Sequence, residues 1–159
     1  MKMLFYYQTP IGCIGILENG SSITHLYFEG EPVPTDALVQ ETALLKEAGR
    51  QLQLYLAGQL QTFTLPLDPG GTEYMRTVWE KLCAIPYGET RSYRDIAHSL
   101  GNPKAARAVG LANNKNPLPL FIPCHRVIGA NQKLVGYRGG LRVKGQLLEL
   151  EKQRKELIT

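Results

Sequence analysis

With 159 residues the chain can form one medium domain or two small ones, and it is long enough to bury a substantial core. A hydrophobic fraction of 43% and a charged fraction of 20% exclude disordered and fibrous proteins, and no apolar run is long enough to span a bilayer. The net charge of +4 is uneven: residues 1–69 hold three Lys/Arg against seven Asp/Glu, whereas residues 70–159 hold fifteen against seven. This basic excess suits a phosphate-binding surface, although a solvated basic face would give the same count.

The first part of the chain predicts a small sheet with one helix. Three segments alternate as strands do, namely 3–7, 11–17 and 23–28. Gly12 and the Asn19-Gly20 pair favour hairpin turns between them. Helical spacing of apolar residues then runs from Thr35 to Ala57 and ends at Gly58. A short strand is expected at 63–67.

A turn-rich linker, Asp68-Pro69-Gly70-Gly71, follows at the point where the charge changes sign, and it predicts domains at 1–69 and 70–159. The second domain is predicted to be mainly helical. Its expected helices begin after a Thr72 cap, after a Ser92–Asp95 capping box, at Lys104 behind Asn102-Pro103, and at Leu141. The two middle helices, joined by a tight turn at Gly101, form a helix-turn-helix candidate.

The cysteines and histidines indicate neither a disulfide framework nor a metal site. Cys13, Cys83 and Cys124 cannot all pair within the chain, and a reducing compartment explains them best. No C-x-x-C spacing or zinc pattern is present. The N-terminal residues lack the apolar core and cleavage site of a secretion signal. We therefore expect a cytoplasmic protein with no metal and no membrane contact.

The most informative stretch is Pro123-Cys124-His125-Arg126-Val127. A cysteine attacks as its thiolate, and an unperturbed pKa of about 8.5 leaves only a small ionised fraction at neutral pH. A nearby base corrects this, and histidine is the usual choice. Taken alone, however, a buried free cysteine beside an incidental histidine is the commoner explanation of such a pair.

The surrounding motifs change that assessment. In fixed order they are Pro-Tyr-Gly-Glu-Thr at 86–90, Ser92-Tyr93, Gly-Asn-Pro-Lys-Ala-Ala-Arg-Ala-Val-Gly at 101–110, Asn116-Pro117, Ile-Pro-Cys-His-Arg-Val at 122–127 and Gly-Tyr-Arg-Gly-Gly-Leu at 136–141. With them, residues 72–151 closely resemble the catalytic domain of the O6-alkylguanine-DNA alkyltransferases. The N-terminal part resembles that family's ribonuclease H-like domain more loosely.

The resemblance implies a role for each residue of the expected reaction. Cys124 matches the nucleophile and alkyl acceptor, and His125 matches the residue that takes the thiol proton through a water. Glu151 matches the carboxylate that orients this histidine, although without the resemblance it would be one more helical acid. Tyr93 matches the hydroxyl that donates to guanine N3 as the base leaves, which stabilises the transition state more than the ground state.

Further residues match the DNA-binding surface and the alkyl pocket. Arg107 matches the arginine that fills the space left by an extruded nucleotide, although it could also be a simple phosphate contact. The other expected DNA contacts are Thr90, Ser92, Lys104, Ala105, Ala106, Ala108, Gly110 and Arg126. The small ones suit a helix that approaches DNA closely, or alternatively tight packing within the domain. Asn116 matches the hinge that ties together the turns around the cysteine. The expected pocket residues are Pro119, Val127, Tyr137, Arg138 and Gly139.

The expected fold is therefore α/β: a small ribonuclease H-like sheet-and-helix domain followed by a mainly helical, winged helix-turn-helix-like domain. The resemblance implies a single, irreversible alkyl transfer from O6-alkylguanine (also O4-alkylthymine) to Cys124, with base flipping and no cofactor. The expected partner is double-stranded DNA containing the damaged base, bound by a monomer. The alternatives are a non-catalytic alkyltransferase-like damage sensor, a helix-turn-helix regulator and a cysteine hydrolase. The cysteine argues against a sensor, a regulator would not require Pro123-Cys124-His125 or Glu151, and a missing Gly-rich oxyanion motif and the basic C-terminal domain argue against a hydrolase.

Overall fold

The computed structural model describes residues 1–158 and divides into two compact units. Unit 1 is Met1–Gly70, and unit 2 begins at Gly71. Gly70 and Gly71 have φ values of 62° and 78°, in the left-handed region that glycine adopts without strain. Within the described residues, no helix has the length and apolar character needed to cross a membrane.

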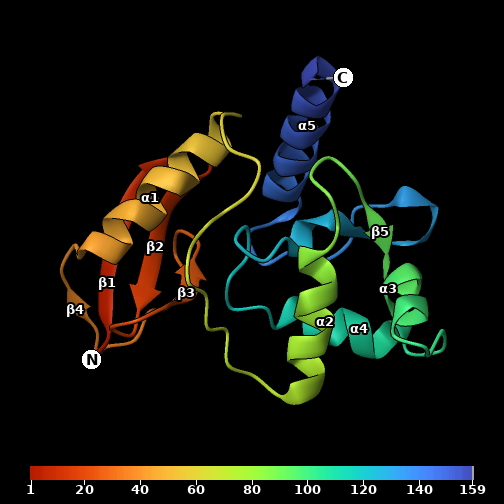
Figure 1. Cartoon of the computed structure of the whole chain (residues 1–159), viewed down its shortest axis with the longest axis horizontal. Coiled ribbons are helices and arrows are strands. Elements are labelled where there is room, and N and C mark those ends of the chain that lie inside the picture. Colours follow the sequence, from red (N-terminus) through yellow and green to blue (C-terminus); the bar gives the residue numbers. More distant parts are fainter. Residues whose placement is uncertain (159) are drawn as a thin grey trace. The chain divides into compact units, whose positions relative to one another are not determined.

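Unit 1 contains a four-stranded sheet with one helix against it (Figure 1). Its strands are β1 (Met3–Thr9), β2 (Gly12–Glu18), β3 (Ile23–Tyr27) and β4 (Leu38–Val39), in the order β3-β2-β1-β4. The first three are antiparallel hairpin neighbours, as the turn residues predict, and β4 lies parallel to β1. The helix is α1 (Ala43–Leu56), whose apolar face packs on the first three strands. The core between them includes Leu4, Ile14, Ile16, Leu26, Leu45, Leu52 and Tyr55.

Two expectations for unit 1 are wrong. The helix does not begin at Thr35, because Leu38 and Val39 pair with Met3 and Leu4 as β4. It begins after Thr42, whose hydroxyl accepts a hydrogen bond from Leu45 N at 3.2 Å. The strand expected at 63–67 is reduced to a single bridge between Ile23 and Leu67. Pro66 lacks an N–H, so this segment cannot form a regular ladder.

Unit 2 is mainly helical, as expected. Its helices are α2 (Glu73–Cys83), α3 (Tyr93–Ser99), α4 (Ala106–Asn114) and α5 (Leu141–Ile158). The predicted caps are confirmed: Thr72 caps α2, and Ser92 with Asp95 forms a capping box at α3. Two short 3₁₀ turns, η1 (Cys124–Arg126) and η2 (Ala130–Gln132), complete the unit together with the two-residue strands β5 (Arg91–Ser92) and β6 (Val127–Ile128).

The start of α4 differs from the prediction. The helix begins at Ala106 rather than at Lys104, because the preceding residues form a turn. Asn102 accepts hydrogen bonds from Ala105 N with its carbonyl oxygen (3.0 Å) and from Lys104 N with its side chain (3.3 Å). Asn102 therefore stabilises the turn of the helix-turn-helix instead of capping α4. Arg107 consequently lies in the first turn of the helix.

The small sheet of unit 2 brings distant residues together. β5 and β6 are parallel, with Arg91 opposite Val127 and Ser92 opposite Ile128. Tyr93 follows β5 directly, and the η1 turn that begins at Cys124 precedes β6 directly. This pairing therefore positions Tyr93 relative to the cysteine.

Candidate active site

Cys124 lies at the start of the η1 turn and is 5% exposed. Asn116 fixes the chain in front of this turn: its side-chain nitrogen donates to Ile122 O at 2.9 Å, and its side-chain oxygen accepts from Leu118 N at 2.9 Å. Cys124 N in turn donates to Ile122 O at 2.7 Å. Leu120 adopts a φ of 72°, a conformation rare for a residue with a side chain, and these bonds hold it there. The Asn116 side chain thus joins the turns in front of the cysteine, which is the position expected for it from the family resemblance.

A very small cavity opens beside Cys124. Its volume is about 10 Å³, which is about the space that one water molecule needs. Its lining is Asn113, Asn114, Asn116, Pro119, Cys124, Gly136, Tyr137 and Arg138. Pro119, Tyr137 and Arg138 are therefore at the pocket as expected, whereas Val127 and Gly139 do not line it. Arg138 closes one side by donating from Nη1 to Asn116 O at 2.9 Å. A purine base cannot enter this cavity unless the walls move.

A buried ion-pair network lies behind the cysteine. His125 Nε2 is 2.7 Å from Glu151 Oε2, and both side chains are almost fully buried. Burial lowers the pKa of His125 and outweighs the opposing effect of Glu151, so the imidazole is neutral and able to accept a proton. Burial acts to raise the pKa of Glu151, but hydrogen bonds from His125 and Arg126 and the charge of the Arg126 guanidinium prevail and hold it at about 2. Glu151 is therefore a carboxylate at neutral pH.

Arg126 is part of this network, which corrects its predicted role as a DNA contact. It is 8% exposed, and its Nε and Nη2 donate to the two oxygens of Glu151 at 2.8 and 3.0 Å. Its Nη1 donates to Ile85 O at 2.8 Å. A guanidinium that is held in the interior in this way cannot also bind an external phosphate.

The thiol of Cys124 has a raised pKa because it is buried. A hydrogen bond from Asn116 and the charges of Arg138 and Lys144 act in the opposite direction. The resting group is therefore a thiol, and forming the nucleophile requires a proton acceptor. The neutral His125 satisfies that requirement chemically.

Tyr93 is half-buried at the start of α3. Burial and the nearby charge of Cys124 raise its pKa, and a side-chain hydrogen bond from Asn113 acts in the opposite direction. Tyr93 is therefore a neutral phenol that can donate a proton. The sequence reasoning missed Asn113, whose buried position in the last turn of α4 is shown by its 3% exposure.

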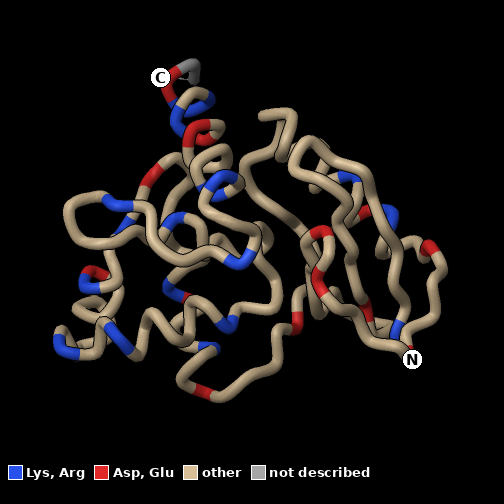
Figure 2. The backbone as a smooth tube through the Cα atoms, turned by 180° about the vertical axis from the view of Figure 1, so that it is seen from behind, with Lys and Arg blue, Asp and Glu red and all other residues tan. Residues whose placement is uncertain are grey.

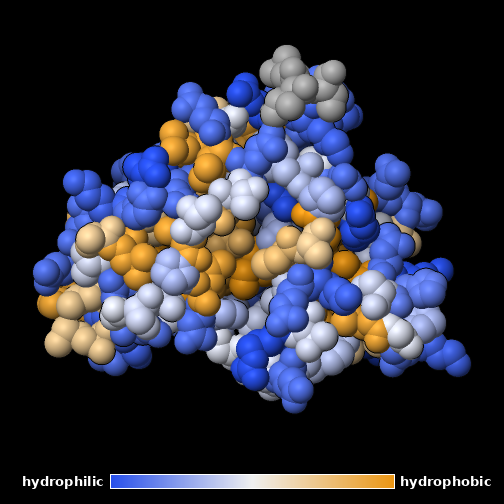
Figure 3. Space-filling model, viewed as in Figure 1, coloured by the Kyte–Doolittle hydropathy of each residue, from blue (hydrophilic) through white to orange (hydrophobic). Residues whose placement is uncertain are grey.

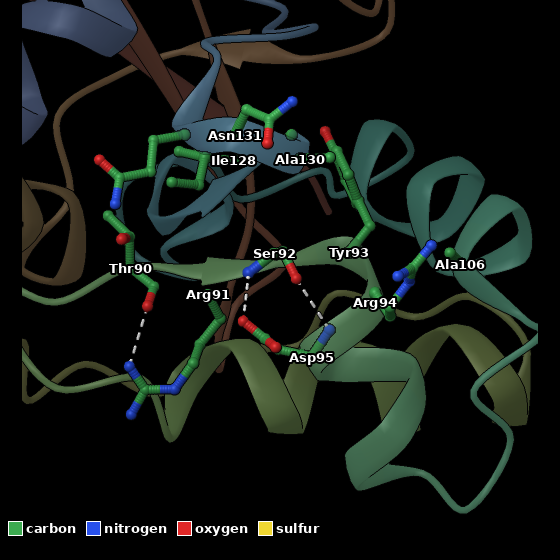
Figure 4. Close-up of a pocket in the computed structure, with 12 residues that line it drawn as sticks. Thr90, Arg91, Ser92, Tyr93, Arg94, Asp95, Ala106, Ile128, Ala130 and Asn131 are labelled. Atoms are coloured by element: carbon green, nitrogen blue, oxygen red, sulfur yellow. Dashed lines mark hydrogen bonds between the residues drawn. The ribbon is translucent and has the colours of Figure 1, made fainter.

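A larger cavity of about 530 Å³ is lined in part by Tyr93 (Figure 4). Its lining includes three of the expected DNA contacts, Thr90, Ser92 and Ala106, and the two cations Arg91 and Arg94. The Ser92 side chain is engaged in capping, since it accepts from Asp95 N at 3.0 Å. Any contact of Ser92 with a phosphate would therefore depend on its hydroxyl hydrogen.

The expected DNA contacts on α4 and in the turn before it differ in exposure. Arg107 and Ala108 are exposed there, as is Lys104 in the preceding turn, whereas Ala105, Ala106 and Gly110 are partly buried. Gly110 faces Tyr93, and a Cβ at this position would lie 3.8 Å from the tyrosine ring. Lys and Arg are numerous along unit 2 (Figure 2), and the surface over its helices in the view of Figure 3 is largely hydrophilic.

The sequence reasoning also missed Lys144. This residue of α5 is completely buried, and its Nζ donates to Val127 O at 2.7 Å and to Val135 O at 2.8 Å. A signal was available, because Lys144 lies on the same stripe of the helix as Leu147, Leu148 and Glu151. A search of residues 1–158 finds no group of three or more His, Cys, Asp or Glu that could hold a metal ion.

Comparisons with known proteins identify the family of this chain. Residues 4–69 match the ribonuclease-like domain of the 6-O-methylguanine DNA methyltransferase family, and residues 73–153 match its DNA binding domain. The methylated-DNA–protein-cysteine methyltransferase of Methanosarcina barkeri is 49% identical over 91% of this chain and 93% of its own. The constitutive enzyme of that name from Bacillus subtilis is 49% identical over 91% and 92%. The crystal structure of Mycobacterium tuberculosis OGT in complex with DNA superposes with a TM-score of 0.90, 46% identity and coverage of 96% and 94%.

Proposed function

Because this chain belongs to the 6-O-methylguanine DNA methyltransferase family, we propose that it repairs DNA by moving the alkyl group of O6-alkylguanine, or of O4-alkylthymine, irreversibly onto Cys124. One observation carries the proposal: a buried cysteine is followed by a neutral histidine that is paired with a carboxylate, and it interacts electrostatically with a tyrosine that can donate a proton. Such an arrangement suits nucleophilic displacement.

The atoms balance in a single displacement. The Sγ–carbon bond forms as the carbon–O6 bond of the damaged base breaks, so the base leaves as its anion. The thiol proton passes through a water to His125, whose charge Glu151 then stabilises. Tyr93 donates to N3 of the leaving base and offsets the developing negative charge. The product is a thioether, which water does not cleave, so each molecule reacts once.

The damaged base must leave the duplex to react. Cys124 is buried, and an alkyl carbon at guanine O6 is not accessible in the stack. Arg107, exposed in the first turn of α4, would fill the vacated space, while Lys104 and the small residues of α4 contact the backbone. In this proposal unit 2 binds double-stranded DNA as a monomer and performs the chemistry, and unit 1 supports it structurally.

The decisive experiment is a titration with duplex DNA containing O6-methylguanine at tenfold excess. We expect the protein mass to increase by one methylene, on Cys124, and the reaction to stop at one equivalent. Cys124→Ser should lose transfer and keep DNA affinity within several-fold of the parent. Binding of the damaged duplex with no mass change would identify a sensor instead, and turnover beyond one equivalent would exclude the single-use mechanism.

Base extrusion is tested separately through Arg107. Arg107→Ala should slow repair of duplex DNA much more than reaction with the free alkylated base, because only the duplex requires a residue to fill the gap. Equal losses on both substrates would assign Arg107 to the pocket or to the fold.

A further inference from the structure

Helix α4 carries a large hydrophobic side chain on its exposed face. Leu111 is 58% exposed, which is more than any other large hydrophobic residue that the structure describes in unit 2. The opposite face of α4 packs into the unit through the buried residues Val109, Ala112 and Asn113. Single exposed leucines are common on protein surfaces, so the position of Leu111 must decide whether it has a role.

Leu111 shares one stripe of α4 with two residues of the proposed site. Arg107, Leu111 and Asn114 follow one another at spacings of four and three residues, which places them on the same side of the helix. All three are exposed. Asn114 also lines the small cavity beside Cys124. Leu111 therefore lies between the arginine that is proposed to fill the gap in the duplex and the cavity in which the alkyl group is transferred.

The side chains of this region suit different parts of a DNA groove. Lys104 and Arg107 are exposed cations, which attract phosphates. Leu111 has neither a charge nor a side-chain hydrogen-bonding group, so it can bind neither phosphates nor the polar edges of bases. Apolar side chains such as leucine do occur in the minor groove, where they contact base steps and help to hold the duplex in a distorted form. The exposed Ala108 allows α4 to approach such a groove closely.

We propose that Leu111 packs in the minor groove beside the extruded nucleotide and supplies an apolar part of the affinity for DNA that depends little on salt. The inference rests on the proposed function for the extrusion of the base. Leu111 becomes buried only when α4 lies on the duplex, so its contact stabilises the same complex in which Arg107 fills the gap. Counterion release applies to the contacts of Lys104 and Arg107 but not to that of Leu111, and salt therefore separates the two contributions.

The first test measures binding to an undamaged duplex that holds one protein molecule, at several salt concentrations. Leu111→Ala should weaken binding about fivefold at every concentration, because less apolar surface is buried. The slope of log affinity against log salt should not change. Lys104→Ala should instead reduce that slope by about one. Leu111→Met keeps the apolar surface and should bind within about twofold of the parent. Leu141→Ala removes a leucine that is 49% exposed at the start of α5 and should change neither quantity.

Three results of this test would overturn the proposal. The first is an unchanged affinity of Leu111→Ala. The second is a reduced slope in that variant, which would mean that the substitution disturbs phosphate contacts. The third is a loss of affinity that appears only on a long duplex holding several molecules, which would assign Leu111 to a contact between copies of the chain. Because the side chain is exposed, the melting temperature of Leu111→Ala should equal that of the parent, and this measurement verifies that the fold is intact.

The second test follows methyl transfer to Cys124. With DNA below saturation, Leu111→Ala should slow repair of a duplex that contains O6-methylguanine by about fivefold, in step with its affinity, and it should leave the reaction with the free methylated base unchanged. Equal slowing with both substrates would place Leu111 in the pocket and overturn the proposal. A parent that transfers no methyl group from either substrate would refute the proposed function, and the binding test would then decide on Leu111 by itself.

Discussion

The two units bury polar groups in different ways. Unit 1 buries the carboxylate of Glu18, and its partners are neutral: Glu18 accepts from Gly20 N at 2.5 Å and from Thr42 Oγ1 at 2.7 Å. Unit 2 buries His125, Arg126, Lys144 and Glu151 around one cysteine. Glu18 therefore stabilises a helix cap, whereas His125, Arg126 and Glu151 of unit 2 bond to one another beside the cysteine. Burying these charges costs unit 2 stability, and the same charges surround its reactive cysteine.

Neutralising each buried carboxylate should reveal the largest difference. Glu151→Gln leaves the buried guanidinium of Arg126 unpaired, and the free energy of unfolding should fall by about 3–5 kcal/mol. Glu18→Gln still offers an oxygen to Gly20 N and Thr42, so its loss should be about 1 kcal/mol. Urea unfolding of both variants measures the comparison. Similar losses would show that the network in unit 2 is no more demanding than a helix cap.

Acid should affect unit 2 early. The pKa of His125 is lowered by burial, so its stabilising contribution is complete above its unfolded value of about 6.5 and decreases as the pH falls below it. Glu151, with a pKa of about 2, loses its contribution as the pH falls from about 4.3 towards that value. Trp79 is the single tryptophan and lies in unit 2. As the pH is lowered, the fluorescence of Trp79 should change at a higher pH than the sheet signal of unit 1 in circular dichroism. If both signals changed at the same pH, the two units would not differ in their sensitivity to acid.

Two glycines provide a matched pair of substitutions. In α1, a Cβ at Gly49 would lie 2.6 Å from the Tyr7 ring, so Gly49→Ala should destabilise unit 1 by about 1–3 kcal/mol. In α4, a Cβ at Gly110 finds room, and Gly110→Ala should stabilise the helix by up to about 1 kcal/mol. The same methyl should weaken DNA binding if α4 approaches the duplex closely. Thermal melting measures the stability of both variants, and a DNA titration measures the affinity of Gly110→Ala. An unchanged affinity would show that the duplex does not approach α4 at Gly110.

An effect smaller than that of Glu151→Gln is expected at the contact between α2 and α4. Trp79 Nε1 donates to Ala112 O at 2.9 Å in the interior of unit 2. Trp79→Phe keeps most of the apolar surface but removes the donor, and we expect a loss of about 1–2 kcal/mol with little change in alkyl transfer. A strong loss of transfer at full stability would show that the position of α4 controls the chemistry.

Local signals in the sequence predicted the helices well where they were unambiguous. The caps at Thr72 and Ser92 have the predicted partners, because capping depends on residues only three positions apart. The start of α1 was not predictable, since Leu38 and Val39 form a strand only because β1 lies beside them. Two-residue strands carry no periodicity of their own.

The site followed the same division. The motifs indicated Cys124, His125 and Glu151, and the structure places the histidine and the carboxylate 2.7 Å apart. Arg126 was predicted to contact DNA, whereas its burial depends on Glu151 of α5, which is 25 residues further along the chain. Lys144 was missed for the same reason: its two acceptors are backbone carbonyls, which no sequence pattern identifies.

The short parallel ladder pairs Arg91 and Ser92 with Val127 and Ile128. It separates the residues proposed to react from the residues proposed to hold DNA. Tyr93 and the Cys124 turn directly flank the two strands. Helix α4 and the turn before it lie in the stretch of chain that connects β5 to β6. Substitutions and changes of length in α4 and the turn before it can alter how a duplex is bound without moving the tyrosine and the cysteine. The affinity for a duplex can therefore be altered by such changes while the reacting groups stay in place.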